Sequence, residues 1–88
     1  MIKQDSNKIV KNIGRRIAET RESRGLTQAA LAYKTGMSLR WLQQIESGWD
    51  FPFKSLIRIA NVLTCDYTDF FKKASTQPRG RGRPKKRK

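Results

Sequence analysis

Helical periodicity is the feature that most constrains the fold of this chain. Between about residues 8 and 73, apolar side chains recur every third or fourth position, and no segment shows the strict alternation of a strand. In the first segment Ile9, Ile13 and Ile17 recur at four-residue steps, with Val10 beside them. Such a stripe is typical of a helix that buries one face. The pattern predicts an all-α domain.

Residues that begin and end helices divide this body into short pieces. Gly25, Gly36 and Gly48 each follow a periodic segment, where glycine takes the left-handed conformation without strain. Thr27 and Ser38 precede the second and third segments, and their side-chain oxygens are suited to cap a helix.

Two more helices are expected after Pro52. The first carries a stripe of Leu56, Ile59 and Leu63. Asp66, with Asp69 three residues later, resembles a capping box and opens a last short helix. That helix carries three aromatic residues: Tyr67, Phe70 and Phe71. A compact five-helix domain is the prediction.

Charge and composition narrow the function classes. Twenty Lys and Arg residues stand against seven Asp and Glu residues in 88 positions, a net charge of +13 that favours a polyanionic partner. With no histidine and a single cysteine, the chain lacks Ser-His or Cys-His chemistry and the usual zinc ligands. We therefore expect no enzyme activity, no metal and no cofactor, and Cys65 as a buried, inert thiol.

The sequence gives no sign of a membrane segment. It has neither an apolar run long enough to cross a bilayer nor a signal peptide. We expect no membrane partner and a cytoplasmic, nucleoid-associated location.

The basic residues are concentrated at the C-terminus. Residues 79–88 hold seven of them and no acid. The segment STQPRGRGRPKKRK has no apolar side chain that would anchor it to a core, so we expect it to be disordered when free. The predicted organisation is a flexible start (1–7), a helical body (8–73) and a basic tail (74–88).

The third predicted helix has two unlike faces. On a helical wheel Leu42 and Ile45 mark the inward face, flanked by Leu39 and Glu46, with Trp41 at one border. An unpaired carboxylate on that side would be costly. The opposite face carries four polar side chains: Arg40, Gln43, Gln44 and Ser47.

Arg21 is a candidate partner for Glu46. It continues the Ile13–Ile17 series at the same four-residue step, so it faces inward as well. An ion pair would satisfy both groups and fix the first helix against the third. Alternatively, both side chains lie at helix ends and reach water independently. Periodicity alone does not decide between the two.

The segment GLTQAALAYKTGMSLRWLQQIESG, followed by LIRIANVL and CDYTDFF, resembles the lambda-repressor/Cro-like (XRE) helix-turn-helix family. The resemblance runs from about Ile13 to Phe71. It rests on matched positions at Gly25-Leu26-Thr27-Gln28, Leu31-Ala32, Gly36, Ser38 and Ile45-Glu46-Ser47-Gly48. It implies that Arg21 and Glu46 form a buried ion pair.

The same resemblance implies that the third helix reads bases in the DNA major groove. Leu39, Arg40 and Gln44 match the base-reading positions, and Gln43 shares their face. Arginine can grip guanine and glutamine can grip adenine, each with two hydrogen bonds. Leu39 would then meet a thymine methyl group.

Phosphate contacts are expected on either side of this helix. Gln28 matches a position that holds a backbone phosphate in the family, and the free amides around Thr27 at a helix start suit an anion. We assign Ser38 a capping role with a further phosphate contact. Lys54 is expected to act similarly near the fourth helix.

The loop after Gly48 departs from the family. Relatives commonly carry basic residues here, whereas Asp50 would repel a phosphate. Trp49, Phe51 and Phe53 alternate in this loop, which suits either a dimer contact or packing onto the helical core. We expect Phe53 on the core and leave Trp49 and Phe51 open.

The tail resembles an AT-hook, a minor-groove reader. Glycine lets the backbone approach the groove floor, while arginines extend along an A·T-narrowed groove. A non-specific electrostatic arm and a nuclear-localisation-like run are the alternatives. The residues concerned are Arg79, Arg81, Gly82, Arg83, Pro84 and Lys85.

These observations predict a sequence-specific regulator of transcription that binds double-stranded DNA, most simply as a repressor. By family resemblance it would be a homodimer, and no small-molecule sensor module is visible. The alternatives are the antitoxin of a toxin-antitoxin pair and an architectural DNA-binding protein.

Overall fold

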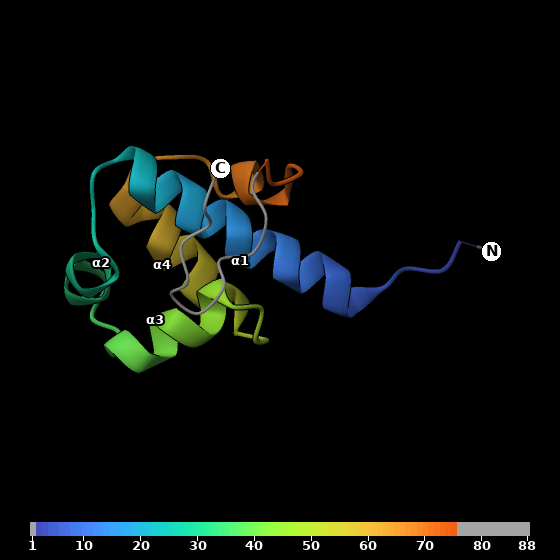
Figure 1. The fold of residues 1–88 in the computed structure, drawn as a ribbon, viewed down its shortest axis with the longest axis horizontal. Coiled ribbons are helices and arrows are strands. Elements are labelled where there is room, and N and C mark those ends of the chain that lie inside the picture. The colour runs from blue at the N-terminus through green and yellow to red at the C-terminus, as the bar shows by residue number, and fades with distance from the viewer. Residues whose placement is uncertain (1, 76–88) are drawn as a thin grey trace, which may run out of the picture.

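The computed structural model describes residues 2–75, which form a chain of helices without a strand (Figure 1). The elements are α1 (Ser6–Ser23), α2 (Gln28–Thr35), α3 (Leu39–Glu46), α4 (Phe53–Leu63) and the 3-10 helix η1 (Tyr67–Phe71). The all-α prediction is confirmed, with four α-helices and a 3-10 helix as the five elements. α1 begins at Ser6, two residues before the expected start of the helical body.

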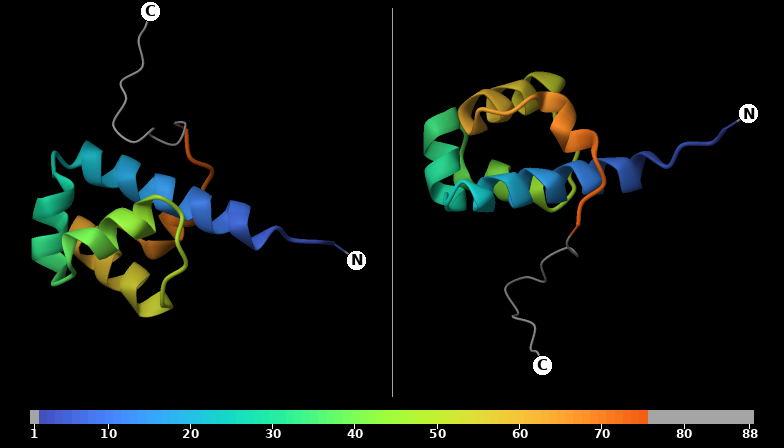
Figure 2. Two further views of the ribbon diagram at one scale, coloured as in Figure 1. Left: turned by 60° about the horizontal axis from the view of Figure 1, so that its bottom comes forward. Right: turned by 90° about the horizontal axis from the view of Figure 1, so that it is seen from above.

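The long helix α1 runs the length of the domain (Figure 1). Seen from above, α1 lies on one side, α4 and η1 lie on the other, and α2 closes the end away from the N-terminus (Figure 2). α1 contacts η1, α3 and α4, while α2 contacts α3 and α4. The first turns of α1 extend beyond the other helices.

All five elements contribute to one apolar core: the four α-helices turn most of their predicted stripes inward, and η1 buries Phe70 while Tyr67 and Phe71 stay exposed. The buried cluster consists of Ile13, Ile17, Leu31, Ala32, Leu42, Ile45, Leu56, Ile59, Ala60, Leu63 and Phe70. Ile9 is the exception, with 46% of its surface exposed. It lies on the part of α1 that projects past the other helices, so the prediction that Ile9 joins the core stripe is wrong.

The predicted helix starts are confirmed by their hydrogen bonds. Thr27 Oγ1 accepts the N–H of Ala30 at 3.0 Å. Asp66 opens η1 by accepting from both the N–H and the hydroxyl of Thr68. These bonds hold the pKa of the Asp66 carboxyl below its ordinary value.

A glycine inside α1 lets this helix approach α3 closely. A Cβ atom added to Gly14 would lie 2.5 Å from the carbonyl oxygen of Ile45 and 2.9 Å from that of Glu46. No side chain fits in this space without moving the backbone of α3. Gly14 therefore fixes the distance between α1 and the C-terminal turn of α3.

The aromatic residues after Gly48 divide between core and surface. Phe51 is half-buried and packs against the core, whereas Trp49 is 58% exposed. Phe53 is 56% exposed, so the prediction that it folds onto the core is wrong. It is the first residue of α4, and its ring packs edge-on against that of Tyr67, with the ring centroids 5.6 Å apart.

Cys65 lies half-buried against the core. Burial, and secondarily the charge of Asp69, raises the pKa of its thiol. Because the thiolate is the reactive form, this environment suits an inert thiol.

Candidate nucleic-acid interface

α2 and α3 form a helix-turn-helix unit. Each has eight residues, and only Gly36, Met37 and Ser38 separate them. Gly36 has a φ of 76°, in the left-handed region that favours glycine, and the Met37 N–H donates to the Ala32 carbonyl at 3.0 Å. Two helices in contact across such a short glycine-containing turn define the motif.

The two faces of α3 differ sharply in burial. Leu42 and Ile45 are fully buried. Arg40 and Gln43 are exposed on the other side, and Gln44 is half-buried. The helix therefore presents polar side chains outward from a backbone that is anchored by its apolar side.

Leu39, the first residue of α3, is 42% exposed. Its side chain lies at the edge of the outward face, where it is accessible to an apolar group of a ligand. Just before it, Ser38 Oγ accepts the N–H of Trp41 at 3.0 Å and caps the helix. The start of α3 thus combines a fixed backbone with an accessible side chain.

Glu46 is held inside the domain by Arg21. Arg21 Nε donates to Glu46 Oε2 at 2.7 Å, and Arg21 Nη2 donates to Glu46 Oε1 at 3.1 Å. Arg21 Nη1 donates to the Leu26 carbonyl at 2.7 Å. Arg21 is 7% exposed and Glu46 is 4% exposed, so neither reaches water independently. This two-pronged contact ties α1 to the end of α3.

Gln28 extends this polar contact to the outward face of α3. Its Nε2 donates to Glu46 Oε1 at 3.0 Å, and its Oε1 accepts from Gln43 Nε2 at 3.3 Å. Neither bond was predicted from the sequence. Position 28 is far from 43 and 46 in the chain, and only the geometry of the α2–α3 turn brings the three together.

Arg40 and Gln44 are available to a partner molecule. Within residues 2–75, no side-chain hydrogen bond or ion pair holds either of them. A guanidinium group and a carboxamide can each make two directed hydrogen bonds to a base edge. The exposed side of α3 therefore has the chemistry to read bases.

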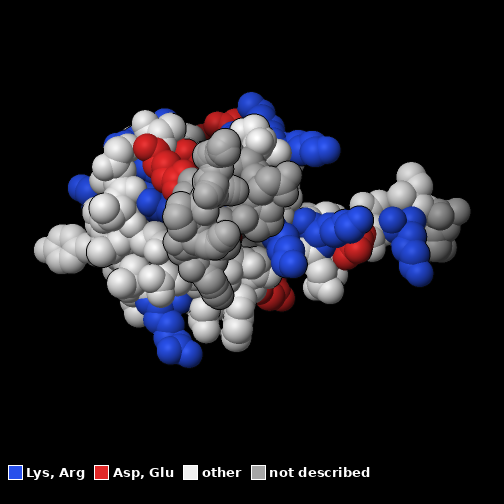
Figure 3. Space-filling view, in the orientation of Figure 1, with Lys and Arg blue, Asp and Glu red and all other residues white. Residues whose placement is uncertain are grey.

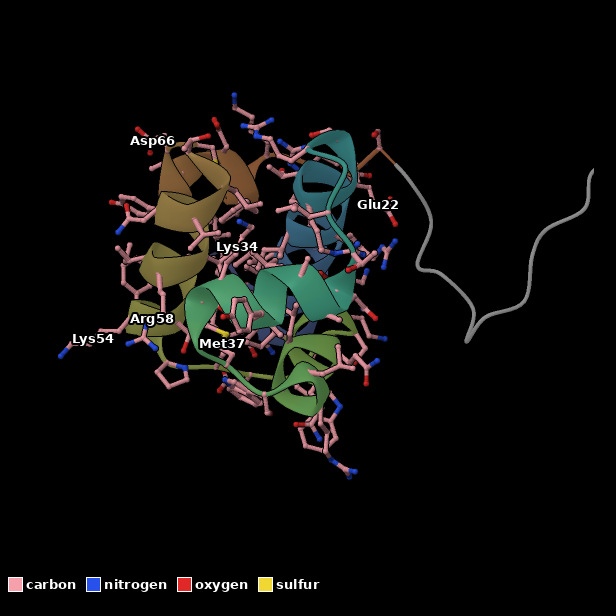
Figure 4. The ribbon with its side chains drawn as sticks, turned by 90° about the vertical axis from the view of Figure 1, so that its left-hand side faces the viewer. Glu22, Lys34, Met37, Lys54, Arg58 and Asp66 are labelled. Carbon is pink, nitrogen blue, oxygen red and sulfur yellow. The ribbon has the colours of Figure 1, made fainter. Side chains whose placement is uncertain are left out.

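The expected phosphate contacts lie at the edges of this face. Thr27 and Ser38 use a hydroxyl oxygen to cap α2 and α3, which leaves each hydroxyl proton for an anion. Lys54 is exposed and points outward from the first turn of α4 (Figure 4). In that view it leaves the domain on the opposite side from the start of α2.

Basic side chains do not form one continuous patch on the face shown in Figure 3. Where the surface is visible, Lys and Arg are spread around the outline. Asp50 lies exposed in the loop after α3, with its carboxylate accepting the Phe51 N–H at 2.9 Å. The minor-groove candidates lie outside the described residues, namely Arg79, Arg81, Gly82, Arg83, Pro84 and Lys85.

Residues 2–75 contain neither a membrane-spanning helix nor a metal-binding group of side chains. None of their helices combines the length and apolar character needed to span a bilayer. In the same part of the chain, no three side chains of the metal-binding types gather into a group that would hold an ion.

Comparison with known proteins defines the class. Residues 12–67 match the helix-turn-helix domain family, and this match includes all of α2, α3 and α4. The chain belongs to that family, and its resemblance to the XRE group of helix-turn-helix proteins is confirmed.

Several solved structures are similar to this chain. The restriction-modification controller protein C.AhdI from Aeromonas hydrophila is 24% identical, with a TM-score of 0.68, covering 70% of this chain and 96% of that one. An HTH_3 family transcriptional regulator from Vibrio cholerae is 34% identical, with a TM-score of 0.70 over 76% of this chain. This chain spans only 38% of that regulator.

The third is the hypothetical transcription factor NHTF from Neisseria, at 15% identity and a TM-score of 0.71, covering 83% of this chain and 85% of that one. A search of curated proteins finds no match. The similarities to C.AhdI and NHTF concern the fold.

Proposed function

We propose that this protein is a sequence-specific transcriptional regulator, most simply a repressor, that binds double-stranded DNA. The observation that carries the proposal is the orientation of α3. Its outward face offers Arg40, Gln43 and Gln44 to a ligand, while Leu42, Ile45 and Glu46 hold the helix in the domain. Such a helix fits the major groove, where its side chains reach base edges.

Phosphate contacts on both sides of α3 would set the register of the domain on DNA. Gln28, Thr27 and Ser38 lie at the starts of α2 and α3, where free backbone amides favour an anion. Lys54 supplies a cation on the opposite side of the domain. An arrangement on opposite sides suits contacts with the two backbones that border one groove.

The basic tail would add a second contact with the same DNA molecule. Arg81-Gly82-Arg83-Pro84 and its basic neighbours suit an A·T-rich minor groove. Because tail and domain are covalently linked, each raises the effective concentration of the other at the site. This function places the protein in the cytoplasm with the nucleoid.

The proposal includes a homodimer, and an exposed aromatic row supports it. Phe53, Tyr67 and Phe71 are 56%, 39% and 49% exposed. Their rings pack edge-on, with centroids 5.6 and 5.9 Å apart. Exposed aromatic clusters of this kind are typical of interface cores.

A second copy of the chain is the partner that fits this row best. Asp66 and Asp69 lie on the same short helix and its cap, so the row borders carboxylates that would repel DNA. Lys72, with a side chain 69% exposed, supplies the opposite charge beside them and pairs with Asp69 at 3.1 Å within the chain. A surface with both signs can pair with itself across a two-fold axis, as two half-sites about one helical turn apart require.

The dimer is tested by sedimentation equilibrium on Tyr67→Ala and Phe71→Ala. Each should shift the chain toward monomer. Tyr33→Ala is the matched control, because Tyr33 is 88% exposed on α2, which does not belong to the row. If the two η1 variants associate as the native chain does, the aromatic row is not the interface.

Selection of bound sequences from random duplexes tests the function itself, using the full chain and residues 1–76. The full chain should select a two-fold symmetric motif with A·T-rich flanks, and truncation should remove only the flank preference. If the tail neutralises roughly five phosphates, truncation should also flatten the slope of log K against log salt by about 4 to 5. Binding without sequence preference would instead indicate an architectural protein.

A further inference from the structure

Three polar side chains form a directed hydrogen-bond chain between the buried ion pair and the DNA-facing side of α3. It runs from Gln43 Nε2 to Gln28 Oε1 at 3.3 Å, and from Gln28 Nε2 to Glu46 Oε1 at 3.0 Å. Glu46 is itself bound by Arg21 through both carboxylate oxygens. The inner end of the chain is therefore a fixed, buried carboxylate.

The carboxylate determines which way each amide points. An ionised carboxylate accepts hydrogen bonds and donates none. Gln28 must therefore turn its NH2 group toward Glu46, which leaves its carbonyl oxygen facing Gln43. A carbonyl oxygen also only accepts, so Gln43 must turn its own NH2 group toward Gln28. The buried Glu46 carboxylate thus fixes the orientation of the exposed Gln43 amide, with Gln28 as the residue between them.

The donors and acceptors that remain match a particular base. After one N–H is bound to Gln28, Gln43 retains one N–H and its carbonyl oxygen. Adenine presents the N7 acceptor and the N6 donor in the major groove, which a glutamine binds with one N–H and one oxygen. Gln28 keeps its second N–H, which is free for the expected phosphate contact. Both roles are therefore compatible with the observed bonds.

We propose that Gln28 is a positioning residue that fixes the amide of Gln43, and that this makes Gln43 an adenine-selecting side chain. The base-reading half of this proposal rests on the proposed function, DNA binding. It assigns base reading to Gln43, which shares a face with Arg40 and Gln44. Without Gln28, the exposed Gln43 amide rotates freely and offers its NH2 group or its oxygen to any base. Selectivity at that base pair then falls.

The first test uses the full chain without DNA. Gln28→Met keeps the length of the side chain and removes the amide. Side-chain amide resonances in nitrogen-15 NMR should then shift for Gln43, and its amide protons should exchange faster with water. Gln44 serves as the control within the same molecule, and its resonances should stay in place. Unchanged Gln43 resonances in Gln28→Met would overturn the proposal.

The second test measures affinity for the selected duplex and for duplexes with each base pair changed in turn. The native chain should prefer adenine at one position by roughly 5- to 150-fold, the range for one two-bond contact. Gln28→Met and Gln43→Met should each remove this preference, and combining them should cause no further loss. The preference for the base read by Arg40 should persist in all three variants.

The outcomes separate this proposal from the function on which it rests. Equal weakening of every duplex by Gln28→Met, with the adenine preference intact, means that Gln28 only holds a phosphate, and the positioning role is wrong. If Gln28→Met does not fold, Gln43→Met still tests the proposal, because Gln43 is exposed and its replacement should not disturb folding. An adenine preference in Gln43→Met as strong as in the native chain overturns the proposal. If the native chain shows no base preference, the proposed sequence-specific DNA binding is wrong. The NMR measurement without DNA still decides whether Gln28 orients the Gln43 amide.

Discussion

The two faces of α3 differ in how far the rest of the domain contacts their side chains. On the inward face Leu42 and Ile45 are fully buried, and Glu46 is bound by Arg21 and Gln28. On the outward face Arg40 is exposed, and no hydrogen bond or ion pair within residues 2–75 holds its side chain. The inward side of this eight-residue helix thus carries its stability, whereas on the outward side the Arg40 and Gln44 side chains make no hydrogen bond or ion pair within residues 2–75.

This difference shows how a small domain can change its ligand without changing its fold. Substitutions on the inward face should alter the free energy of unfolding, because every contact there is internal. Substitutions on the outward face should alter binding and leave stability within about 0.5 kcal/mol.

Removal of one partner of the buried ion pair should have the largest effect. Glu46→Ala leaves the buried Arg21 guanidinium with the partly exposed Glu22 carboxylate at 3.5 Å as its remaining acidic partner, which should lower the free energy of unfolding by up to about 3–5 kcal/mol. Gln44→Ala, on the other side of the same turn, should change it by no more than about 0.5 kcal/mol. Urea denaturation of both variants provides the comparison.

The double variant Arg21→Met, Glu46→Met refines this prediction. Replacement of both charges by apolar side chains removes the unpaired buried group, so the double variant should be more stable than Glu46→Ala. Equal stability of Glu46→Ala and the native chain would mean that the ion pair does not hold α3.

Gly14 tests the approach of α1 to the inward side of α3. A Cβ at this position would meet two backbone carbonyl oxygens of α3 at 2.5 and 2.9 Å, so Gly14→Ala should destabilise the domain by about 1–3 kcal/mol. Helix propensity predicts the opposite sign, because alanine is favoured over glycine by about 1 kcal/mol in a helix interior. A raised melting temperature would therefore contradict the close contact.

The cap of α3 should have a smaller effect. Ser38→Ala removes the acceptor of the Trp41 N–H, with an expected cost of about 0.5–2 kcal/mol measured by thermal unfolding. Ser38→Asp should retain most of the stability, because aspartate caps as well as serine does. If both variants lose the same amount, the contribution of Ser38 is not a capping hydrogen bond.

Periodicity predicted the helices, and capping residues predicted the starts of α2, α3 and η1, because each of these signals is local. Thr27 caps α2 and Ser38 caps α3. Leu42 and Ile45 face inward, as their spacing predicts. Periodicity could not show where a helix leaves the domain. Ile9 has the same spacing as Ile13, yet it lies in the first turn of α1 and 46% of its surface is exposed.

Contacts between helices were predictable only in part. Arg21 and Glu46 were identified as possible partners because each is a charged residue at an inward position. Gln28 is polar at the start of a helix, where its link to Glu46 and Gln43 depends on the turn between α2 and α3. Gly14 was not predicted to have a role, because its contact with the backbone of α3 depends on how the two helices pack.

The most direct test of the central claim is the affinity of Arg40→Ala for the selected duplex and for duplexes with single base changes. Arg40 projects from the outward face of α3, so its loss should cost about 1–3 kcal/mol on the selected site and relax specificity at one base pair, with the free energy of unfolding unchanged. Equal weakening on every duplex would mean that Arg40 touches only phosphate. Unchanged binding would mean that this face of α3 does not enter the groove.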